Sequence, residues 1–369
     1  MKHILGSFLG LFVFSLTLSN AQPFFNKSRL FDEGRFPNVV ITTEGTVLVT
    51  WGSGDFFVRR SEDGGQTWEP TITVASPGFQ GGGTLVDETT GDILVFVEEK
   101  HPVSPLTIYR SQDDGRTWEQ QQYTILPDSL GHIPSMHMNE SGITLTQPPY
   151  QGRLIRPTRF YGAGNDRPFW HTHYTNAMYS DDGGATWQTS APFPVRGTGE
   201  AAIVELEDGR LYYNSRRHFS DDGRTAKRRY IAYSEDGGAT WNDAQIEENL
   251  PDGAQHTDYG LMAGLDIEFS DNGSSLMLFS NIDVPAETPD EVVPFEQRTT
   301  RRFRGTVWGS YDEGLTWPIK KLVEPGSFAY SSLCFGRKGT PTEGLIYLFY
   351  EHNGGGEMKV FNREWLLED

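Results

Sequence analysis

The chain has 369 residues, of which 36% are hydrophobic and 13% aromatic, with 41 glycines and a formal net charge of −19. This composition indicates a turn-rich β protein with a substantial core and excludes a disordered chain. The strong negative charge disfavours nucleic acids and anionic membranes as partners, because both are negatively charged themselves.

The first 21 residues have the pattern of a secretory signal peptide. Lys2 supplies a positive start, residues 4–18 are apolar, and Ser19-Asn20-Ala21 forms a small-residue cleavage site. We expect cleavage after Ala21, a secreted or periplasmic product, and one folded domain over residues 22–369. A membrane anchor is the alternative, for which the apolar run is short.

One motif recurs five times along the chain. The copies read RSEDGGQTWEP (60–70), RSQDDGRTWEQ (110–120), YSDDGGATWQT (179–189), YSEDGGATWND (233–243) and GSYDEGLTWPI (309–319). Each copy follows a short β-like run and precedes another. Its aspartate can accept hydrogen bonds from turn amides, its glycine permits positive φ, and its tryptophan can pack beneath the turn. The motif therefore predicts a hairpin turn with a structural role, and it resembles the Asp-box of sialidase-like proteins.

The predicted strands come in groups of four. Similar units begin near residues 35, 81, 141, 199, 259 and 330, which predicts an all-β fold, a six-bladed β-propeller of four-stranded antiparallel blades. The last unit has no Asp-box, so we expect the segment PFFNKSRLF (23–31) to supply its missing strand. A seven-bladed propeller and a β-sandwich are the alternatives. Cys334, the only cysteine, lies in a predicted strand of the last unit, so no internal disulfide forms and an inert core thiol is expected.

Counting strands places several polar residues at one end of the ring, opposite the Asp-boxes. They are Arg35, Asp55, Glu200, Arg216, Arg302 and Tyr330. Arginine is not the usual surface residue of such an acidic chain. Several arginines at one mouth therefore favour a bound anion, because guanidinium grips a carboxylate with two hydrogen bonds and stays charged.

These segments resemble those of bacterial exo-sialidases over essentially the whole mature chain. GRFPNVVITTEGTVLVTW is similar to the segment that carries the first carboxylate-binding arginine, here Arg35. GEAAIVELEDGRLYYNSR is similar to the segment with the glutamate and second arginine, Glu200 and Arg216. RFRGTVWGSYDEGLTWP implies Arg302 as the third arginine, with Arg301 and Arg304 as rivals. AYSSL implies Tyr330 as the nucleophile.

The resemblance implies a retaining hydrolase that acts on a terminal carboxylated sugar of a glycan and uses no cofactor. Arg35, Arg216 and Arg302 would bind the carboxylate, and Glu200 would take the proton of Tyr330. The general acid of the family lies in a sizeable loop that is only GSGD here, which leaves Asp55 as the candidate.

Four histidines leave alternative functions open. His171 and His173 lie in an inserted segment, NDRPFWHTHYTN, and His132 and His137 lie in GHIPSMHM. Two histidines with no third ligand fixed by spacing do not predict a metal site. A lyase or dehydratase that acts on uronic-acid oligosaccharides through the same arginines is one alternative, and a non-catalytic glycan-binding propeller is another.

Overall fold

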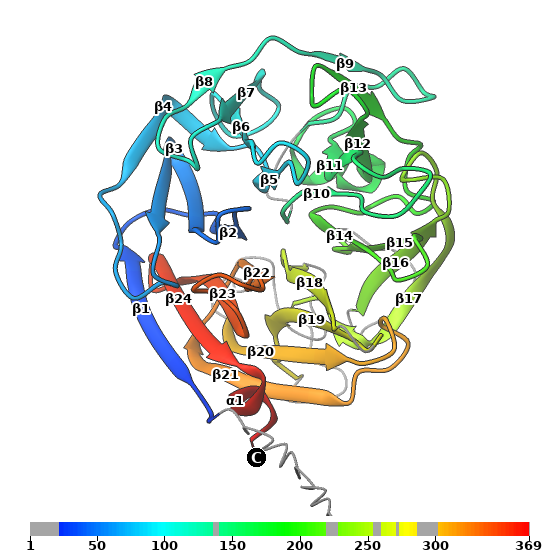
Figure 1. The fold of residues 1–369 in the computed structure, drawn as a ribbon. Coiled ribbons are helices and arrows are strands. Elements are labelled where there is room, and N and C mark those ends of the chain that lie inside the picture. Colours follow the sequence, from blue (N-terminus) through cyan, green and yellow to red (C-terminus); the bar gives the residue numbers. More distant parts are fainter. Residues whose placement is uncertain are drawn as a thin grey trace, which may run out of the picture.

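A computed structural model of the protein describes residues 22–135, 140–218, 228–253, 260–270, 273–285 and 302–368. The predicted signal peptide lies outside these residues, as do His137 and Arg301. The described residues form a ring of mostly antiparallel sheets around a central axis (Figure 1). The prediction of an all-β propeller is therefore confirmed. In this part of the chain, no helix is long and apolar enough to cross a membrane.

Two sheets consist of four strands in simple chain order. The first contains β14 (Ala201–Glu205), β15 (Leu211–Ser215), β16 (Arg228–Ser234) and β17 (Asn242–Pro251). The second contains β18 (Gly264–Phe269), β19 (Ser275–Ile282), β20 (Phe303–Ser310) and β21 (Ile319–Ser327). Both match the predicted blades, because consecutive strands pair with each other in antiparallel order.

A third sheet borrows a strand from the blade before it. It contains β10 (Ile143–Thr144), β11 (Leu154–Phe160), β12 (Tyr174–Ser180) and β13 (Thr186–Thr189), and β9 (Thr124–Leu126) pairs with β13 in parallel. A short 3₁₀ helix, η1 (Arg167–Thr172), lies in the segment between β11 and β12.

The two ends of the chain close the ring. β1 (Phe25–Phe31) pairs with β24 (Gly355–Asn362), next to β23 (Leu345–His352) and β22 (Ser331–Phe335). The short helix α1 (Arg363–Leu367) follows β24. The predicted contribution of residues 23–31 to the last blade is thus confirmed.

The remaining described strands form one sheet rather than two. It contains β2 (Asn38–Ile41), β3 (Val47–Ser61), β4 (Ile72–Gln80), β5 (Leu85–Val86), β6 (Ile93–Glu98), β7 (Leu106–Ser111) and β8 (Glu119–Gln120). β4 pairs with β6 through Phe79 with Glu98 and Gln80 with Val97. The sheets of the described residues therefore number five, because this short ladder joins two predicted units, and the count of six blades stays a prediction.

β3 reverses direction near its middle. The ring centroids of Trp51 and Phe57 are 5.4 Å apart, whereas six residues of straight strand span about 20 Å. A Cβ atom on Gly52 would lie 2.5 Å from the carbonyl oxygen of Asp55. The chain therefore folds back at Gly52–Asp55, where the sequence GSGD predicted a turn.

All five Asp-box copies form the same hydrogen-bonded turn. In the first, Ser61 Oγ donates to Asp63 Oδ1 at 2.8 Å, Gly65 N donates to Ser61 Oγ at 2.8 Å, and Thr67 N donates to Asp63 Oδ1 at 2.8 Å. The other four copies repeat these contacts. The aspartates bond their own turns, as expected for a structural motif.

Glycine is required inside these turns. Gly115 has φ +84°, and a Cβ atom there would lie 2.4 Å from Leu48 Cδ1. The backbone conformation favours glycine, and any Cβ atom would also displace the end of the Leu48 side chain.

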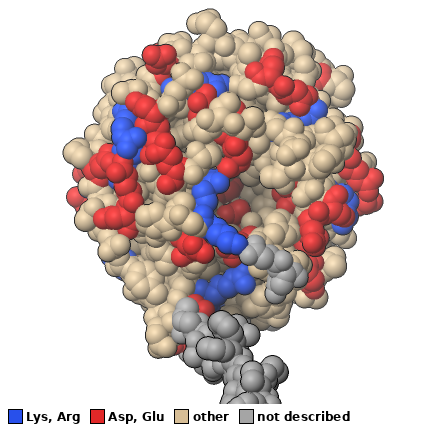
Figure 2. Space-filling view, viewed as in Figure 1, with Lys and Arg blue, Asp and Glu red and all other residues tan. Residues whose placement is uncertain are grey.

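Apolar side chains join neighbouring blades into one body. One cluster contains Val307 of β20, Leu333 of β22 and Leu348 of β23. On the face drawn in Figure 2, acidic side chains are spread widely, and basic side chains lie among them and beside a central hollow. This mixture agrees with the negative net charge of the chain.

Candidate active site

Five predicted site residues lie at the same end of the ring. Glu200, Arg302 and Tyr330 directly precede β14, β20 and β22. Arg35 lies three residues before β2, and Arg216 directly follows β15. Since β20 begins directly after Arg302 and ends at Ser310 of an Asp-box, the Asp-boxes mark the opposite end of the ring. The predicted convergence of these five side chains follows from the alternation of strand direction.

Glu200, Arg216 and Tyr330 form a buried cluster. Ala201 pairs with Ser215, which brings the residues on either side of this pair together. Arg216 Nη1 donates to Glu200 Oε1 at 2.7 Å and Oε2 at 2.6 Å, and lies 3.4 Å from the Tyr330 hydroxyl. Glu200 is 1% exposed and Tyr330 is 3% exposed. A carboxylate and a phenol from opposite parts of the chain thus share one guanidinium.

Two opposing effects act on the carboxyl group of Glu200. Burial raises its pKa, but the cations Arg216 and Arg159 lower it, and the net shift is downward from the ordinary value. Glu200 is therefore ionised at neutral pH although it is buried. An ionised carboxylate of this kind can accept a proton from a neighbouring phenol.

Arg35 and Arg302 approach Tyr330 from the solvent side. Their Cζ atoms lie 5.4 Å and 4.9 Å from the centroid of the Tyr330 ring. A cavity of about 370 Å³ is lined by these three residues together with Gly34, Ser327, Ala329, Glu351, His352, Asn353 and Gly354. Arg216 does not line this cavity, because it is fully buried against Glu200. Two cations therefore line the cavity, and a third, buried one lies 3.4 Å from the Tyr330 hydroxyl.

Glu351 supports the first arginine. Its Oε1 accepts from Arg35 Nε at 3.2 Å and from the backbone N–H of Phe36 at 3.1 Å. Phe36 has φ 67°, a left-handed conformation that is uncommon outside glycine. The contact between Glu351 and Arg35 was not predicted from the sequence.

Arg301 and Arg304 were the alternative candidates for the third arginine. Arg304 donates from Nε to the carbonyl oxygen of Asp283 at 3.1 Å and does not line the cavity. Arg301 lies outside the described residues. Of the two described arginines, Arg302 is the one that faces Tyr330.

Asp55 lies apart from the cavity. Its Oδ1 accepts from Ser76 Oγ at 2.6 Å, and Asp55 is not among the lining residues. His101, from the loop between β6 and β7, lies on the same side of the ring, with its imidazole 5.4 Å from the Phe79 ring. Burial lowers the pKa of His101, as do Arg159 and Arg35. The role predicted for Asp55 therefore stays a prediction, and His101 is a titratable group that the sequence analysis overlooked.

The histidines of the two singled-out segments have structural contacts where they are described. His132 stacks on Phe160 with centroids 4.0 Å apart, and its Nδ1 lies 2.7 Å from the Tyr174 hydroxyl. His171 is exposed on η1. His173 is fully buried and contacts Arg159. Cys334 is also buried, which raises its pKa well above the ordinary value, so it is an unreactive thiol, as predicted.

Arg159 is the main residue that the sequence analysis missed. Nη1 of Arg159 lies 3.9 Å from Oε1 of Glu200, and Arg159 is 1% exposed. It lies near the end of β11, the second strand of its blade, as Arg216 lies at the end of β15. Strand counting applied to RLIRPTRF in the third blade would have placed it at this mouth.

One further group of side chains has the geometry of metal ligands. Within the described residues, ligand atoms of Glu324, His352 and Glu357 lie within 4.8 Å of one another. However, Lys359 Nζ lies 2.8 Å from Glu324 Oε2, and Lys27 Nζ lies 2.9 Å from Glu357 Oε1. These two ammonium groups already balance the carboxylates, so the group is explained without a metal.

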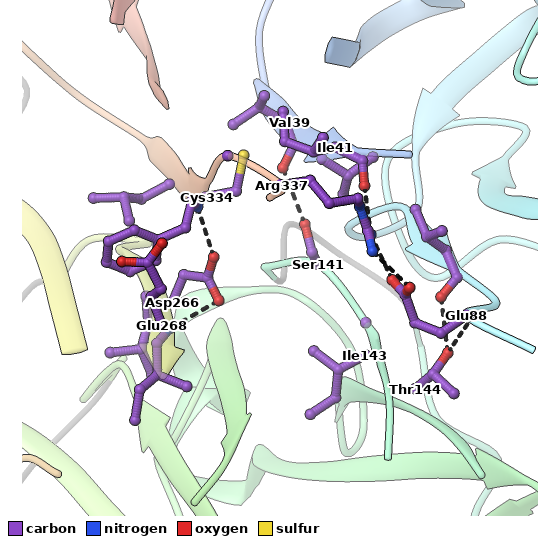
Figure 3. Close-up of a pocket in the computed structure, with 18 of the residues that line it drawn as sticks. Val39, Ile41, Glu88, Ser141, Ile143, Thr144, Asp266, Glu268, Cys334 and Arg337 are labelled. Atoms are coloured by element: carbon purple, nitrogen blue, oxygen red, sulfur yellow. Dashed lines mark hydrogen bonds and ion pairs between the residues drawn. The ribbon is translucent and has the colours of Figure 1, made fainter. Parts of the chain in front are cut away.

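A larger cavity of about 530 Å³ lies elsewhere along the inner strands (Figure 3). Its walls combine aliphatic side chains, such as Val39, Ile143 and Leu265, with polar and charged ones. Arg337 donates to both carboxylate oxygens of Glu88, and Asp266 accepts from the backbone N–H of Phe335 at 2.9 Å. Burial raises the pKa of Asp266 to about 6. Its charged groups bond within the protein, so cavity size alone does not identify the site.

Comparison with known proteins decides the family. Residues 51–342 match the model of the BNR repeat-like domain. The chain belongs to the BNR repeat-like family. It is 29% identical to a sialidase of Micromonospora viridifaciens over 91% of its own length, and 28% identical to a sialidase of Bacteroides fragilis over 85%.

This BNR repeat-like chain spans 52% and 59% of those two relatives. Among solved structures it is similar to the Hadza microbial sialidase Hz136, with 25% identity and a TM-score of 0.63, over 90% of this chain and 66% of that one. The protein is thus a sialidase-like BNR propeller, as the resemblance implied.

Proposed function

We propose that the protein is a secreted glycoside hydrolase that removes a terminal sialic-acid-like sugar, or another carboxylated sugar, from glycans. The observation that carries the proposal is the Glu200–Arg216–Tyr330 cluster beside a cavity lined by Arg35 and Arg302. The names of the related sialidases support the same reaction. The signal-peptide pattern of residues 1–21 supports secretion.

The chemistry follows from charge. A sugar carboxylate is ionised at neutral pH, so Arg35 and Arg302 would hold it in the cavity, with Arg216 adding positive charge behind Tyr330. An anionic nucleophile would be repelled by that carboxylate, whereas a neutral phenol is not. In the first step the oxygen of Tyr330 bonds to the anomeric carbon, Glu200 takes the phenol proton, and the glycosidic oxygen leaves with a proton from a general acid.

The second step reverses these roles. Water attacks the anomeric carbon, the bond to Tyr330 breaks, and the phenol regains its proton from Glu200. The general acid accepts the proton of the water. Two displacements at one carbon retain the anomeric configuration.

The proposal includes a six-bladed ring. The seven-stranded sheet divides into β2–β4 and β5–β8, each with an Asp-box after its third strand when the folded β3 is counted as two. Six blades of four strands surround a channel whose mouth carries the arginines.

The deciding experiment is a panel of sialylated and uronate-ended oligosaccharides, with released products identified by mass and the first released anomer by proton NMR. We expect a free nine-carbon acidic sugar with retained configuration. An unsaturated uronate, which absorbs in the near ultraviolet, would instead support the lyase. Binding of these glycans without turnover would leave only a glycan-binding propeller.

A further inference from the structure

The inserted segment between β11 and β12 ends at a histidine that the proposed reaction does not use. His173 is fully buried, its Nε2 lies 2.8 Å from the carbonyl oxygen of Gly164, and its Nδ1 lies 2.7 Å from Arg159 Nη2. A carbonyl oxygen only accepts hydrogen bonds, and a guanidinium only donates them. Nε2 therefore carries the hydrogen, and Nδ1 accepts from Arg159.

His173 keeps this neutral form over the ordinary pH range. Burial lowers its pKa to about 3, and the Arg159 cation contributes to the same shift. The neutral imidazole thus accepts a hydrogen bond from Arg159 and adds no second positive charge beside it. The guanidinium is also held by the Tyr161 ring, whose centroid lies 4.4 Å from Cζ.

The other end of this guanidinium faces Glu200. Nη1 of Arg159 lies 3.9 Å from Oε1 of Glu200, while Arg216 bonds both carboxylate oxygens. Glu200 is therefore placed between two buried cations. Burial by itself favours the protonated acid, and a protonated Glu200 has no site for the Tyr330 proton.

We propose that Arg159, held by His173, is a positioning residue that keeps Glu200 ionised and oriented toward the Arg216–Tyr330 pair. The inference rests on the proposed function, in which Glu200 accepts a proton. It gives the inserted segment, which the sequence analysis left without a role, a place in catalysis. The segment acts through Arg159 and not through contact with the sugar.

Several charged or titratable groups surround Glu200 and enter its pH dependence. They are Arg216, Arg159, Arg229, Tyr330, Tyr161 and His101. Burial is the largest single effect and raises the pKa of Glu200. The charges of Arg216 and Arg159, together with hydrogen bonds from the backbone and from Arg216, lower it, and the result is below its ordinary value. Loss of Arg159 removes one of the two cations that lower this pKa, so Glu200 would hold its proton at higher pH.

The test compares kcat/KM between pH 4 and pH 8 for the wild type, Arg159→Gln and Arg159→Lys. In Arg159→Gln we expect a loss that is at least about tenfold greater at pH 5 than at pH 7, because the base is protonated earlier as pH falls. Arg159→Lys keeps the charge and should show nearly the wild-type pH profile. Arg196→Gln, an exposed arginine near the same segment, is the matched control and should behave as the wild type.

His173→Leu tests the support of Arg159 separately. It removes the acceptor at Nδ1 and should displace the pH profile in the same direction as Arg159→Gln, by less. If Arg159→Gln does not fold, as judged by circular dichroism, this variant and Arg159→Lys decide the matter. A loss of equal size at every pH in the folded variants would overturn the inference.

A second measurement separates this inference from the proposed function. The side-chain carboxyl ¹³C signal of Glu200, identified by its loss in Glu200→Gln, can be titrated without substrate. Its midpoint should rise in Arg159→Gln, and an unchanged midpoint contradicts the positioning role whatever the enzyme does. A wild type with no turnover on any acidic oligosaccharide contradicts the proposed function alone.

Discussion

At the scale of single residues, the site contains ionised side chains that are buried, although burial disfavours their charged forms. Glu200, Arg216 and Arg159 are all at most 1% exposed, and the carboxylate of Glu200 stabilises both cations. Removing Glu200 would leave two buried cations without their counter-ion, which costs about 3–5 kcal/mol. Variants that keep the shape and remove only the reactive atom are therefore the most informative ones here.

Tyr330→Phe removes the proposed nucleophilic oxygen and keeps the aromatic ring. The hydroxyl contacts Arg216 Nη1 at 3.4 Å, a long and weak interaction, so we expect a folded protein with an almost unchanged thermal midpoint. Its kcat should fall by about 10³-fold or more, as for other enzymes that lose the nucleophile. Tyr311→Phe, at an exposed tyrosine, is the matched control. Undiminished turnover by Tyr330→Phe would remove Tyr330 from the mechanism.

Asp55→Asn tests the predicted general acid through the leaving group. A general acid matters most when the departing oxygen is a poor leaving group, so kcat/KM should fall by about 10²-fold or more on an oligosaccharide and much less on an activated aryl glycoside. His101→Gln, measured in parallel, tests whether His101, a titratable group on the same side of the ring, is the general acid instead. Leaving-group dependence in His101→Gln but not in Asp55→Asn would contradict the assignment of Asp55.

The sequence was sufficient to predict where the site residues at strand ends lie. Strand direction alone brings Glu200, Arg302 and Tyr330 to one mouth, and the resemblance assigns their roles. Arg159 was not predicted because its importance depends on a contact with Glu200 across two blades. A pattern within one strand contains no information on such a contact. The pairing of Glu351 with Arg35 was missed for the same reason.

At the scale of elements, the Asp-box turn was the most predictable part of the molecule. Its hydrogen bonds join residues at most four positions apart, as between Ser61 and Gly65 or Asp63 and Thr67. Local contacts of this kind can be predicted from the residues of one short segment. The ladder between β4 and β6 is not local in that sense, because two predicted blades share it, and it merged them into one sheet.

The Asp-box aspartates should make the fold sensitive to acid. Burial raises the pKa of Asp63, but hydrogen bonds from Thr67, Ser61 and Gln66 lower it, to about 2 overall. A carboxyl whose pKa is lower when folded stabilises the protein above its unfolded value of about 3.9, and this contribution is lost as pH falls toward 2. The thermal midpoint should therefore fall between pH 4 and pH 2.

Asp63→Asn isolates one of these turns. We expect it to lower the thermal midpoint at pH 6 by about 2–4 °C, since it weakens hydrogen bonds at the surface. The difference from the wild type should shrink at pH 2, where Asp63 itself becomes protonated. Asp32→Asn, with a side chain that is 94% exposed, is the control and should show no such trend. A difference that is independent of pH would contradict the role assigned to the charge of Asp63.

At the scale of the whole molecule, the ring depends on contacts between the two ends of the described chain. β1 pairs with β24 from Phe25 with Phe361 to Phe31 with Gly356. The Phe31 ring lies 4.8 Å from that of Trp51 in the first blade and 5.8 Å from that of Phe349 in the last. This closure was predictable because the last unit lacked a strand. The sequence did not reveal that Phe31 also joins the first and last blades.

Removing β1 should open the ring. A chain that begins at Glu33 loses the buried side chains of Leu30 and Phe31, worth about 3–6 kcal/mol, and leaves β24 as an unpaired edge. Compared with the chain that begins at Gln22, we expect a thermal midpoint lower by roughly 10 °C and concentration-dependent association through β24. A synthetic peptide of residues 22–31 should restore the midpoint by pairing with β24. If the shortened chain melts at the same temperature and stays monomeric by light scattering, then the blades hold together without this strand. The mouth that gathers Arg35 and Tyr330 from the first and last blades would then owe its geometry to side-chain packing alone.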